Sequence, residues 1–157
     1  MRKNSGRRRP VWKRFFVTAA VLAVLVLFGW WSNVSLQTEE FSFASPRLPE
    51  AFSGYRIAVL SDLHGAVFGE NNETLLETVA GAEPDMIAVT GDLEDRFRGH
   101  DPEWVQNLAD GLAKIAPVYY ITGNHEWALG DVRTLKKTLK AAGWTVLDNR
   151  HTVLERD

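Results

Sequence analysis

The chain has 157 residues, of which 45% are hydrophobic and 24% are charged, and it contains no cysteine. This length predicts about one domain, and the composition excludes a disordered tail. The absence of cysteine excludes a disulfide scaffold, a zinc finger, an iron–sulfur cluster and a thiol nucleophile.

Charge is distributed unevenly along the chain. Residues 1–14 hold seven of the 18 basic residues and no acidic residue, which leaves 11 basic against 20 acidic residues in the remainder. Nucleic-acid binding requires a basic face, so no nucleic-acid partner is expected for this acidic body. An excess of carboxylates suits cations instead, provided that some of the carboxylates converge.

An uncharged apolar run covers residues 15–31. As a helix it would span roughly 26 Å, slightly less than the ~30 Å hydrocarbon core of a bilayer, and the uncharged residues that follow can extend it. Basic residues precede the run and two tryptophans end it, as at the two interfaces of a membrane-spanning helix. We therefore predict a basic cytoplasmic N-terminus over residues 1–14 and a single-pass transmembrane anchor over residues 15–36. The remaining chain is then expected on the outer side of the cell membrane, with the lipid bilayer as a partner.

A cleaved export signal is the alternative interpretation of the apolar run. Its apolar core would be shorter and a small-x-small cleavage site would follow, whereas Trp30 and Trp31 occupy that region. The uncleaved anchor is therefore favoured, and under the alternative the domain would be exported after signal cleavage.

Residues 37–54 form a predicted linker before the first regular element of the domain. Phe41 and Phe43 alternate with polar residues, which permits a short edge strand in this segment. Pro46 and Pro49 then break the chain.

Residues 55–157 alternate between strand and helix patterns. Asp101, followed by proline, and Asp131 are the expected N-caps of two of the helices. The order of elements predicts an α/β fold with a mainly parallel sheet and right-handed crossovers. The predicted strands cover residues 55–61, 86–90, 118–122 and 144–147, and the predicted helices cover residues 74–82, 101–115 and 131–143.

Metal-ligating residue types follow three of the predicted strands at the point where each strand ends. Because parallel strands end at one edge of a sheet, about 4.8 Å apart, these side chains can meet in one coordination sphere. Carboxylate, imidazole and amide ligands suit Mn²⁺, Fe²⁺, Zn²⁺ or Mg²⁺, and a bridging carboxylate can hold two ions ~3.5–4 Å apart. The residues are Asp62 and His64 after the first strand, Asp92 after the second, and Asn124 and His125 after the third.

These motifs resemble those of the calcineurin-like metallophosphoesterases. The family pattern of Asp-x-His, Gly-Asp-x-x-Asp and Gly-Asn-His-Asp/Glu is present in order at residues 62–64, 91–95 and 123–126. The segment from Leu48 to His64 also resembles the membrane-associated branch of the family, whose members have an N-terminal anchor and include relatives of UDP-2,3-diacylglucosamine pyrophosphohydrolases. The resemblance implies a four-layer α/β/β/α sandwich, of which residues 55–157 would form the N-terminal half.

The resemblance also implies a binuclear metal centre with two divalent ions of Mn, Fe, Zn or Mg. Asp62 and His64 would bind the first ion. Asp92 would bridge the two ions, and Asn124 would bind the second ion through its amide oxygen. A metal-bound hydroxide would then attack phosphorus in line.

Three further residues receive roles from the same resemblance. His125 would be catalytic rather than a ligand, because it would stabilise the transition state or protonate the leaving oxygen. Asp95 and Glu126 would hold the imidazole rings in position from outside the metal coordination sphere.

The loop residues Arg96 and Arg98 are interpreted mainly as solvated charges, with contact to a substrate phosphate as the alternative.

The family's later motifs, a lone His and Gly-His-x-His, do not occur before the chain ends at Asp157, and His151 has neither context. We therefore expect a C-terminally truncated chain, either a fragment of a longer gene product or a truncated relative. With a single sheet, an apolar face would stay exposed. We expect the chain alone to bind metal weakly and to turn over little substrate.

The first functional hypothesis is a membrane-anchored, metal-dependent phosphoesterase that hydrolyses a phosphodiester or pyrophosphate bond. A lipid-linked substrate, as in UDP-2,3-diacylglucosamine hydrolases, would suit the anchor. The alternative is a non-catalytic, membrane-tethered α/β interaction module. A Mg²⁺-dependent phosphotransferase with an aspartyl nucleophile is disfavoured, because it requires Asp-x-Asp after the first strand and the third residue here is His64.

Overall fold

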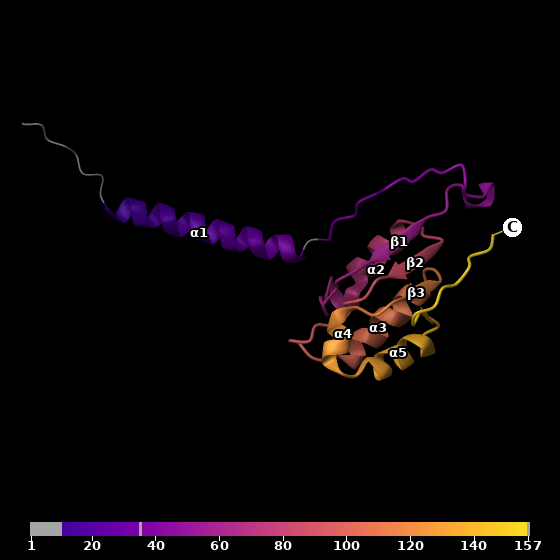
Figure 1. Ribbon diagram of the computed structural model, residues 1–157. Helices are drawn as coiled ribbons and strands as arrows, with labels where there is room; N and C mark the ends of the chain where they lie inside the picture. The colour runs from indigo at the N-terminus through magenta and orange to yellow at the C-terminus, as the bar shows by residue number, and fades with distance from the viewer. Residues whose placement is uncertain (1–10, 35, 157) are drawn as a thin grey trace, which may run out of the picture. The chain divides into compact units, whose positions relative to one another are not determined.

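The computed structural model describes residues 11–34 and 36–156. The chain divides between Gln37 and Thr38 into two compact units, which are described separately. The first unit contains one long helix, and the second contains a parallel sheet with its covering helices (Figure 1).

The helix of the first unit is α1 (Val11–Val34). Its stretch Trp12–Gly29 is long and apolar enough to cross a membrane, and none of this stretch is buried within the protein. The apolar run predicted as an anchor therefore forms a helix of suitable length. Most of the basic cluster lies in residues 1–10, outside the described residues, as do the side chains of Trp30 and Trp31.

The linker leads into the second unit without forming a strand. Residues 36–45 have no regular secondary structure, so the edge strand that the sequence permits is not formed there. The rings of Phe41 and Phe43 are exposed, since no neighbouring strand pairs with this segment and buries them. A single 3₁₀ turn, η1 (Glu50–Phe52), precedes the sheet.

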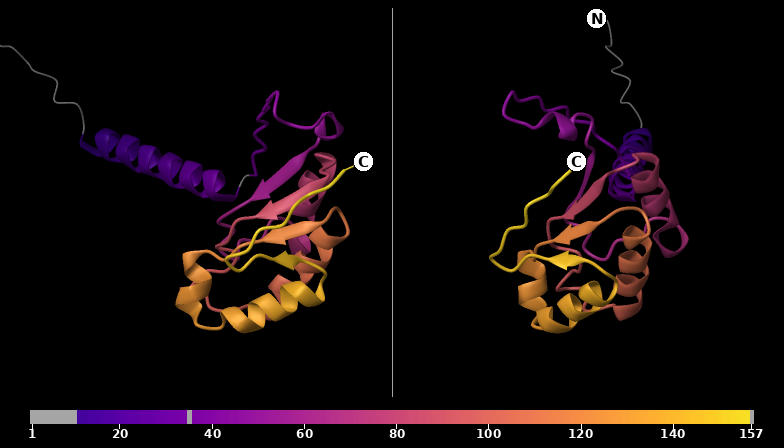
Figure 2. Two further views of the ribbon diagram at one scale, coloured as in Figure 1. Left: turned by 45° about the vertical axis from the view of Figure 1, so that its right-hand side comes forward. Right: turned by 90° about the vertical axis from the view of Figure 1, so that its right-hand side faces the viewer.

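The sheet of the second unit has four strands that pair in chain order, and all pairs are parallel. Right-handed crossovers between strands in this order place every connecting helix on the same face of the sheet, and Figure 2 shows these helices together on one side. The predicted parallel α/β fold is thereby confirmed. The strands are β1 (Ile57–Leu60), β2 (Met86–Val89), β3 (Val118–Tyr120) and β4 (Thr145–Val146), and the connecting helices are α2 (Glu73–Gly81), α3 (Pro102–Ala113) and α5 (Val132–Ala141).

The core lies between the sheet and these helices. Val89 of β2 and Tyr120 of β3 are paired in register and fully buried, and they face the apolar stripes of α3 and α5. The opposite face of the sheet is less covered. Ile57 and Val59 of β1 are 53% and 63% exposed, as expected when a single helix layer packs on one side of a parallel sheet.

The helix starts differ from one another in their capping. The carboxylate of Asp101 accepts a hydrogen bond from the Trp104 N–H at 3.0 Å, which confirms Asp101 as the N-cap of α3. Asp131 occupies the N-cap position of α5, but its side chain makes no capping bond, contrary to the prediction. Its backbone carbonyl instead accepts from the N–H groups of Thr134 and Leu135.

Three short elements are not predicted from the sequence. They are the two 3₁₀ turns, η1 and η2 (Glu70–Asn72), and the helix α4 (Asn124–Leu129). The motif residues Asn124 and His125 therefore lie in the first turn of a helix rather than in an open loop after β3.

Candidate metal centre

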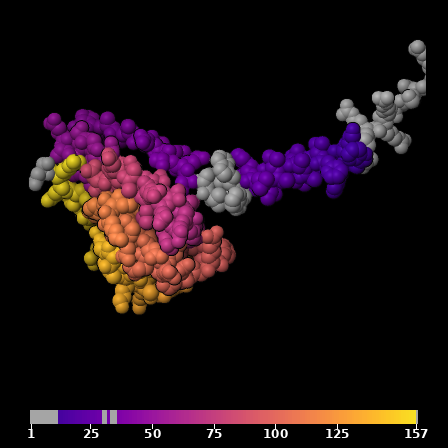
Figure 3. All heavy atoms as spheres, turned by 180° about the vertical axis from the view of Figure 1, so that it is seen from behind, coloured from indigo at the N-terminus to yellow at the C-terminus, as the bar shows by residue number. Residues whose placement is uncertain are grey.

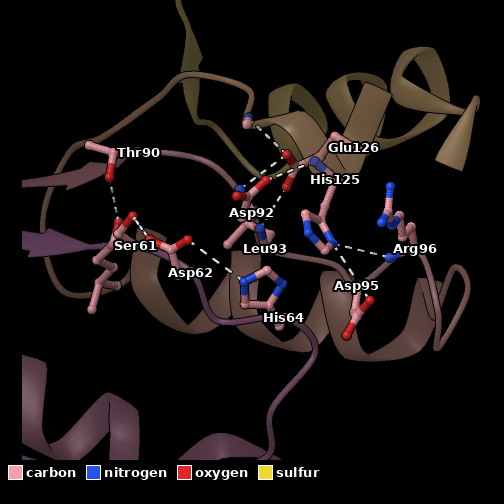
Figure 4. A network of polar contacts seen from close by, with 12 residues as sticks. Ser61, Asp62, His64, Thr90, Asp92, Leu93, Asp95, Arg96, His125 and Glu126 are labelled. Atoms are coloured by element: carbon pink, nitrogen blue, oxygen red, sulfur yellow. Dashed lines mark hydrogen bonds and ion pairs between the residues drawn. The ribbon is translucent and has the colours of Figure 1, made fainter. Parts of the chain in front are cut away.

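The segments that follow β1, β2 and β3 gather at one edge of the sheet (Figure 4). Backbone hydrogen bonds join the first two of them beyond the ends of the strands. The N–H of Asp62 donates to the carbonyl of Gly91 at 3.2 Å, and the N–H of His64 donates to the carbonyl of Asp92 at 2.9 Å. Two predicted ligands from the first segment are thus fixed against the second segment.

Three of the predicted ligands have a left-handed backbone conformation. Their φ angles are 55° at Asp62, 50° at His64 and 52° at Asp92. Such a conformation costs on the order of 1 kcal/mol for a residue other than glycine and is concentrated at functional sites. The turns end β1 and β2 abruptly and direct the chain across the edge of the sheet.

Two glycines allow the second and third segments to approach each other. Gly91 has φ +95°, and a Cβ atom there would collide with the backbone nitrogen of Gly123. A Cβ atom at Gly123 would collide with the carboxylate of Asp92. Side chains at these positions would therefore push Asp92 away from α4.

The side chains of His64, Asp92 and His125 converge. Each offers one ligand atom, and these atoms all lie within 4.8 Å of one another. The two imidazole rings are in edge-to-face contact, with centroids 4.5 Å apart. The structure therefore brings together three residues, each of which lies about 30 positions from the next in the sequence.

The other two predicted ligands lie next to this group. Asp62 is more exposed, and its Oδ1 is 3.7 Å from Nε2 of His64. Its second carboxylate oxygen accepts a hydrogen bond from the hydroxyl of Ser61. Asn124 is the first residue of α4 and directly precedes His125, whose N–H donates to Oδ1 of Asp92 at 2.8 Å.

The chemistry of these groups fits a divalent cation. Nδ1 of His64 is buried and has no hydrogen-bond partner among the residues that the structure describes. The other ring nitrogen, Nε2, lies 3.7 Å from Oδ1 of Asp62. An imidazole ring among carboxylates is a suitable ligand for Mn²⁺, Fe²⁺ or Zn²⁺. His125, to which the resemblance gives a catalytic role, belongs to the same convergent group as His64 and Asp92.

Asp95 lies behind His125. Its Oδ1 is 3.5 Å from Nδ1 of His125 and accepts a hydrogen bond from the Phe97 N–H at 2.8 Å. This backbone hydrogen bond, together with the nearby imidazoles, holds the pKa of Asp95 below its usual value, although partial desolvation opposes the shift. The carboxylate is therefore ionised at neutral pH.

Glu126 is buried, with 1% of its surface exposed. Oε2 accepts hydrogen bonds from the N–H groups of Asp92 at 3.1 Å and Gly123 at 2.8 Å, and Oε1 accepts from the N–H of Leu93 at 2.6 Å. These partners are backbone amides, not the imidazole rings expected from the sequence. One carboxylate thus ties the segment after β2 to the start of α4.

A second buried acid, which was not predicted from the sequence, lies in the motif at residues 91–95. Glu94 is buried, and its Oε1 lies 2.7 Å from Nδ1 of His100 and accepts from the Asp101 N–H at 3.1 Å. Glu94 therefore fastens the end of the loop to the start of α3. No signal in the sequence marks Glu94, because the charged residues Asp95 and Arg96 follow it and such a polar run is typical of a solvated loop.

The sequence profile of the calcineurin-like phosphoesterase family matches residues 55–153. "Transmembrane protein with metallophosphoesterase domain" from Danio rerio is 30% identical over 115 residues, which are 70% of this chain and 25% of that relative. The uncharacterized metallophosphoesterase YkuE of Bacillus subtilis is 27% identical over 126 residues, which are 76% of this chain and 43% of YkuE.

A second Bacillus subtilis protein, the uncharacterized metallophosphoesterase YkoQ, is 35% identical over 101 residues, which are 61% of this chain and 37% of YkoQ. The chain spans less than half the length of these curated relatives. No solved structure matches the chain. The family profile covers more than half of the chain and includes all three motif segments, so the chain belongs to the calcineurin-like phosphoesterase family.

Proposed function

We propose that the natural protein that carries this chain is a membrane-anchored, metal-dependent phosphoesterase that hydrolyses a phosphodiester or pyrophosphate bond. The observation that carries the proposal is the convergence of His64, Asp92 and His125 within 4.8 Å at the carboxyl edge of the sheet. Membership of a metal-dependent phosphoesterase family supports it.

In this proposal two divalent cations would be held at the edge of the sheet. Asp62 and His64 would hold one cation and Asn124 the other, and the carboxylate of Asp92 would serve both. Bound divalent cations lower the pKa of water and neutralise charge on a phosphoryl group. The left-handed turns and the backbone hydrogen bonds of the three segments keep the ligands in place before the cations bind.

His125 handles the proton of the leaving group. Nδ1 of His125 accepts a hydrogen bond from the Arg96 N–H at 3.4 Å and lies 3.5 Å from Oδ1 of Asp95. In the neutral ring the proton is then on Nε2, which can donate a hydrogen bond to the phosphoryl group. Protonation of the departing oxygen takes the imidazolium form, which the Asp95 carboxylate stabilises and which returns to the neutral ring when the proton leaves. Glu126 contributes indirectly, because it holds the backbone N–H groups of Asp92 and Gly123.

The apolar helix α1 anchors the protein in this proposal, with its N-terminus in the cytoplasm and the domain on the outer side. Its length and composition, and relatives that are named as transmembrane proteins, support the anchor. An anchored site is kept close to lipid head groups, so a lipid-linked phosphoester, such as a UDP-diacylglucosamine-like substrate, is the proposed substrate class.

The test is hydrolysis of bis(p-nitrophenyl) phosphate by the natural gene product purified from membranes, with and without Mn²⁺. We expect metal-dependent hydrolysis that falls at least about 100-fold in Asp92→Asn and in His125→Ala. Asp110→Asn, on the exposed face of α3, is the matched control and should retain full activity. Unchanged rates in both site variants would contradict the proposal.

The non-catalytic interaction module remains the second candidate, because the apolar side chains of Ile57 and Val59 are exposed on the sheet face. The two functions differ in their response to metal. An enzyme should show a Tm that rises with Mn²⁺ and loses this response in Asp92→Asn. A module without a metal centre should show the same Tm with and without Mn²⁺ in both proteins.

A further inference from the structure

Each of the three segments that carry the candidate metal centre also presents one large apolar side chain to solvent. These side chains are Val67, Phe97 and Trp127, which are 60%, 78% and 62% exposed. We call these three residues the apolar rim. Val67 follows β1, Phe97 follows β2 and Trp127 belongs to α4, so the apolar rim occupies the same edge of the sheet as the centre.

The position of the apolar rim is distinctive among the described residues of the second unit. Other exposed large apolar side chains of this unit lie in the linker, on the less covered sheet face or in the C-terminal tail. The opposite edge of the sheet, where the strands begin, has no comparable set in the described part of the unit. The residues in those other places are Phe41, Phe43 and Leu48 in the linker, Ile57, Val59 and Ile121 on the sheet face, and Val153 in the tail.

Hydrogen bonds and ring contacts hold the apolar rim in place. The Phe97 ring is in edge-to-face contact with His125, with centroids 6.5 Å apart. Nη1 of Arg98 donates to the carbonyl of Gly65 at 3.1 Å, which joins the segment of Phe97 to the segment of Val67. Figure 3 shows the salmon-coloured segment near residue 100 as a projection on the molecular surface.

The indole of Trp127 is fixed in a similar way. Its Nε1 donates to the hydroxyl of Thr122 at 3.1 Å, and Nζ of Lys136 lies 5.1 Å from its ring. Because these contacts already hold the Trp127 indole in one orientation, little side-chain entropy is lost when it contacts an apolar partner.

Basic side chains accompany the aromatic ones. Arg96 and Arg98 flank Phe97 in the sequence, and the guanidinium of Arg96 lies 4.5 Å from the Phe97 ring. Carboxylates also lie at this edge, and most of them are engaged within the protein. Those of Asp62 and Asp92 belong to the candidate metal centre, and that of Asp95 lies against His125. Glu94 and Glu126 are buried, and Asp101 caps α3. Aromatic and basic residues together are typical of surfaces that enter the interface of an anionic membrane.

We propose that the apolar rim docks on an anionic bilayer surface and thereby places the candidate metal centre at the level of the lipid phosphates. The proposal rests on the proposed membrane anchoring of α1 and does not depend on hydrolysis. The chain between α1 and β1 has roughly 20 residues, which reach ~70 Å when extended. This tether is long enough for the edge of the sheet to turn toward the membrane.

Site-specific fluorescence tests the proposal with the 157-residue chain in vesicles of phosphatidylserine and phosphatidylcholine. The chain contains no cysteine, so Val67→Cys and Phe97→Cys each give a single site for an environment-sensitive label. Spin-labelled lipid in the vesicles should quench both labels by roughly half, since interfacial residues lie ~5–10 Å deep in the head-group boundary. A label at Lys114→Cys, which is exposed just before β3 at the opposite edge, should be unaffected.

Two further measurements decide between the alternatives. Arg96→Gln with Arg98→Gln, or vesicles of phosphatidylcholine alone, should reduce the quenching at Val67→Cys if anionic lipid is bound. A label at Val24→Cys, exposed on α1, reports insertion of the anchor. Circular dichroism of each variant verifies its folding.

Unquenched labels at Val67→Cys and Phe97→Cys would overturn the docking proposal whatever the state of the anchor. If Val24→Cys is quenched in that case, the anchor stands and the apolar rim serves another purpose, such as holding an apolar group of a substrate. If Val24→Cys is also unquenched, the proposed anchoring fails as well. Equal quenching at Lys114→Cys would also overturn the proposal, because the contact would then be unspecific.

Discussion

A single buried carboxylate, that of Glu126, organises the backbone around the candidate metal centre. It accepts hydrogen bonds from three N–H groups, at Asp92, Leu93 and Gly123. These donors belong to two segments that are about 30 residues apart in the chain, so no local preference could position them against each other. The hydrogen bonds to this carboxylate connect the segments after β2 and β3 at a place where strand pairing no longer joins them.

Glu126→Gln should therefore destabilise the protein. The carboxamide presents an NH₂ group where a carboxylate oxygen accepts, so at least one buried N–H loses its partner, at a cost of about 2–3 kcal/mol. Urea unfolding of the detergent-solubilised chain, followed by circular dichroism, measures the change. The matched control Glu77→Gln, on an exposed position of α2, should stay within about 0.5 kcal/mol of the parent chain. Equal free energies of unfolding in the two variants would contradict this role of Glu126.

At the scale of elements, the sequence predicted every strand and connecting helix of the second unit. Their apolar runs and helical spacings are local properties, and local properties decide which element a segment favours. The ends of the strands were less well predicted. β1 stops at Leu60 because Asp62 adopts a left-handed φ, and this conformation is held by the hydrogen bond to Gly91 across the sheet.

The capping of the helices, like the ends of the strands, was not fully predicted from the sequence. Asp101 and Asp131 had the same predicted role, yet only the carboxylate of Asp101 forms a capping bond. The carboxylates of Asp101 and Asp131 therefore make different contributions to the free energy of unfolding, even though both residues stand at helix starts.

Asp101→Ala should lower the free energy of unfolding by about 1 kcal/mol, because the Trp104 N–H loses its acceptor. Asp131→Ala should change it by no more than a few tenths of a kcal/mol, because no side-chain cap is lost. Both changes are measured by the same urea unfolding, and an effect of Asp131→Ala as large as that of Asp101→Ala would contradict the assignment of the caps.

At the scale of the whole molecule, the core between the sheet and its helices includes a titratable tyrosine, Tyr120. Tyr120 is fully buried, and its ring lies 6.1 Å from that of Trp144. Burial, reinforced by the negative charge of Glu126, raises the pKa of Tyr120 well above the value of 10.0 for an ordinary tyrosine. The folded protein therefore keeps this hydroxyl protonated in alkaline solution.

Alkaline pH should destabilise the fold through Tyr120. Above about pH 10 the tyrosine of the unfolded chain releases its proton and the folded one does not, so the free energy of unfolding falls by about 1.4 kcal/mol per pH unit from this group. Tyr120→Phe should lack this contribution, while all other titrating groups stay the same. Urea unfolding of both proteins between pH 8 and 11 measures the difference. Parallel pH profiles would contradict the raised pKa.

The sequence by itself determined the α/β fold, the order of its elements and the edge of the sheet at which the motif residues gather, because apolar periodicity and the geometry of parallel strands are readable along the chain. It also indicated the apolar helix before the domain. Only the tertiary structure decided that Glu126 binds backbone amides rather than imidazoles and that Glu94 is buried against His100. It also decided that Val67, Phe97 and Trp127 share one exposed edge. These properties depend on contacts between segments far apart in the chain, and the residue types of one segment do not specify which groups of another segment will face them.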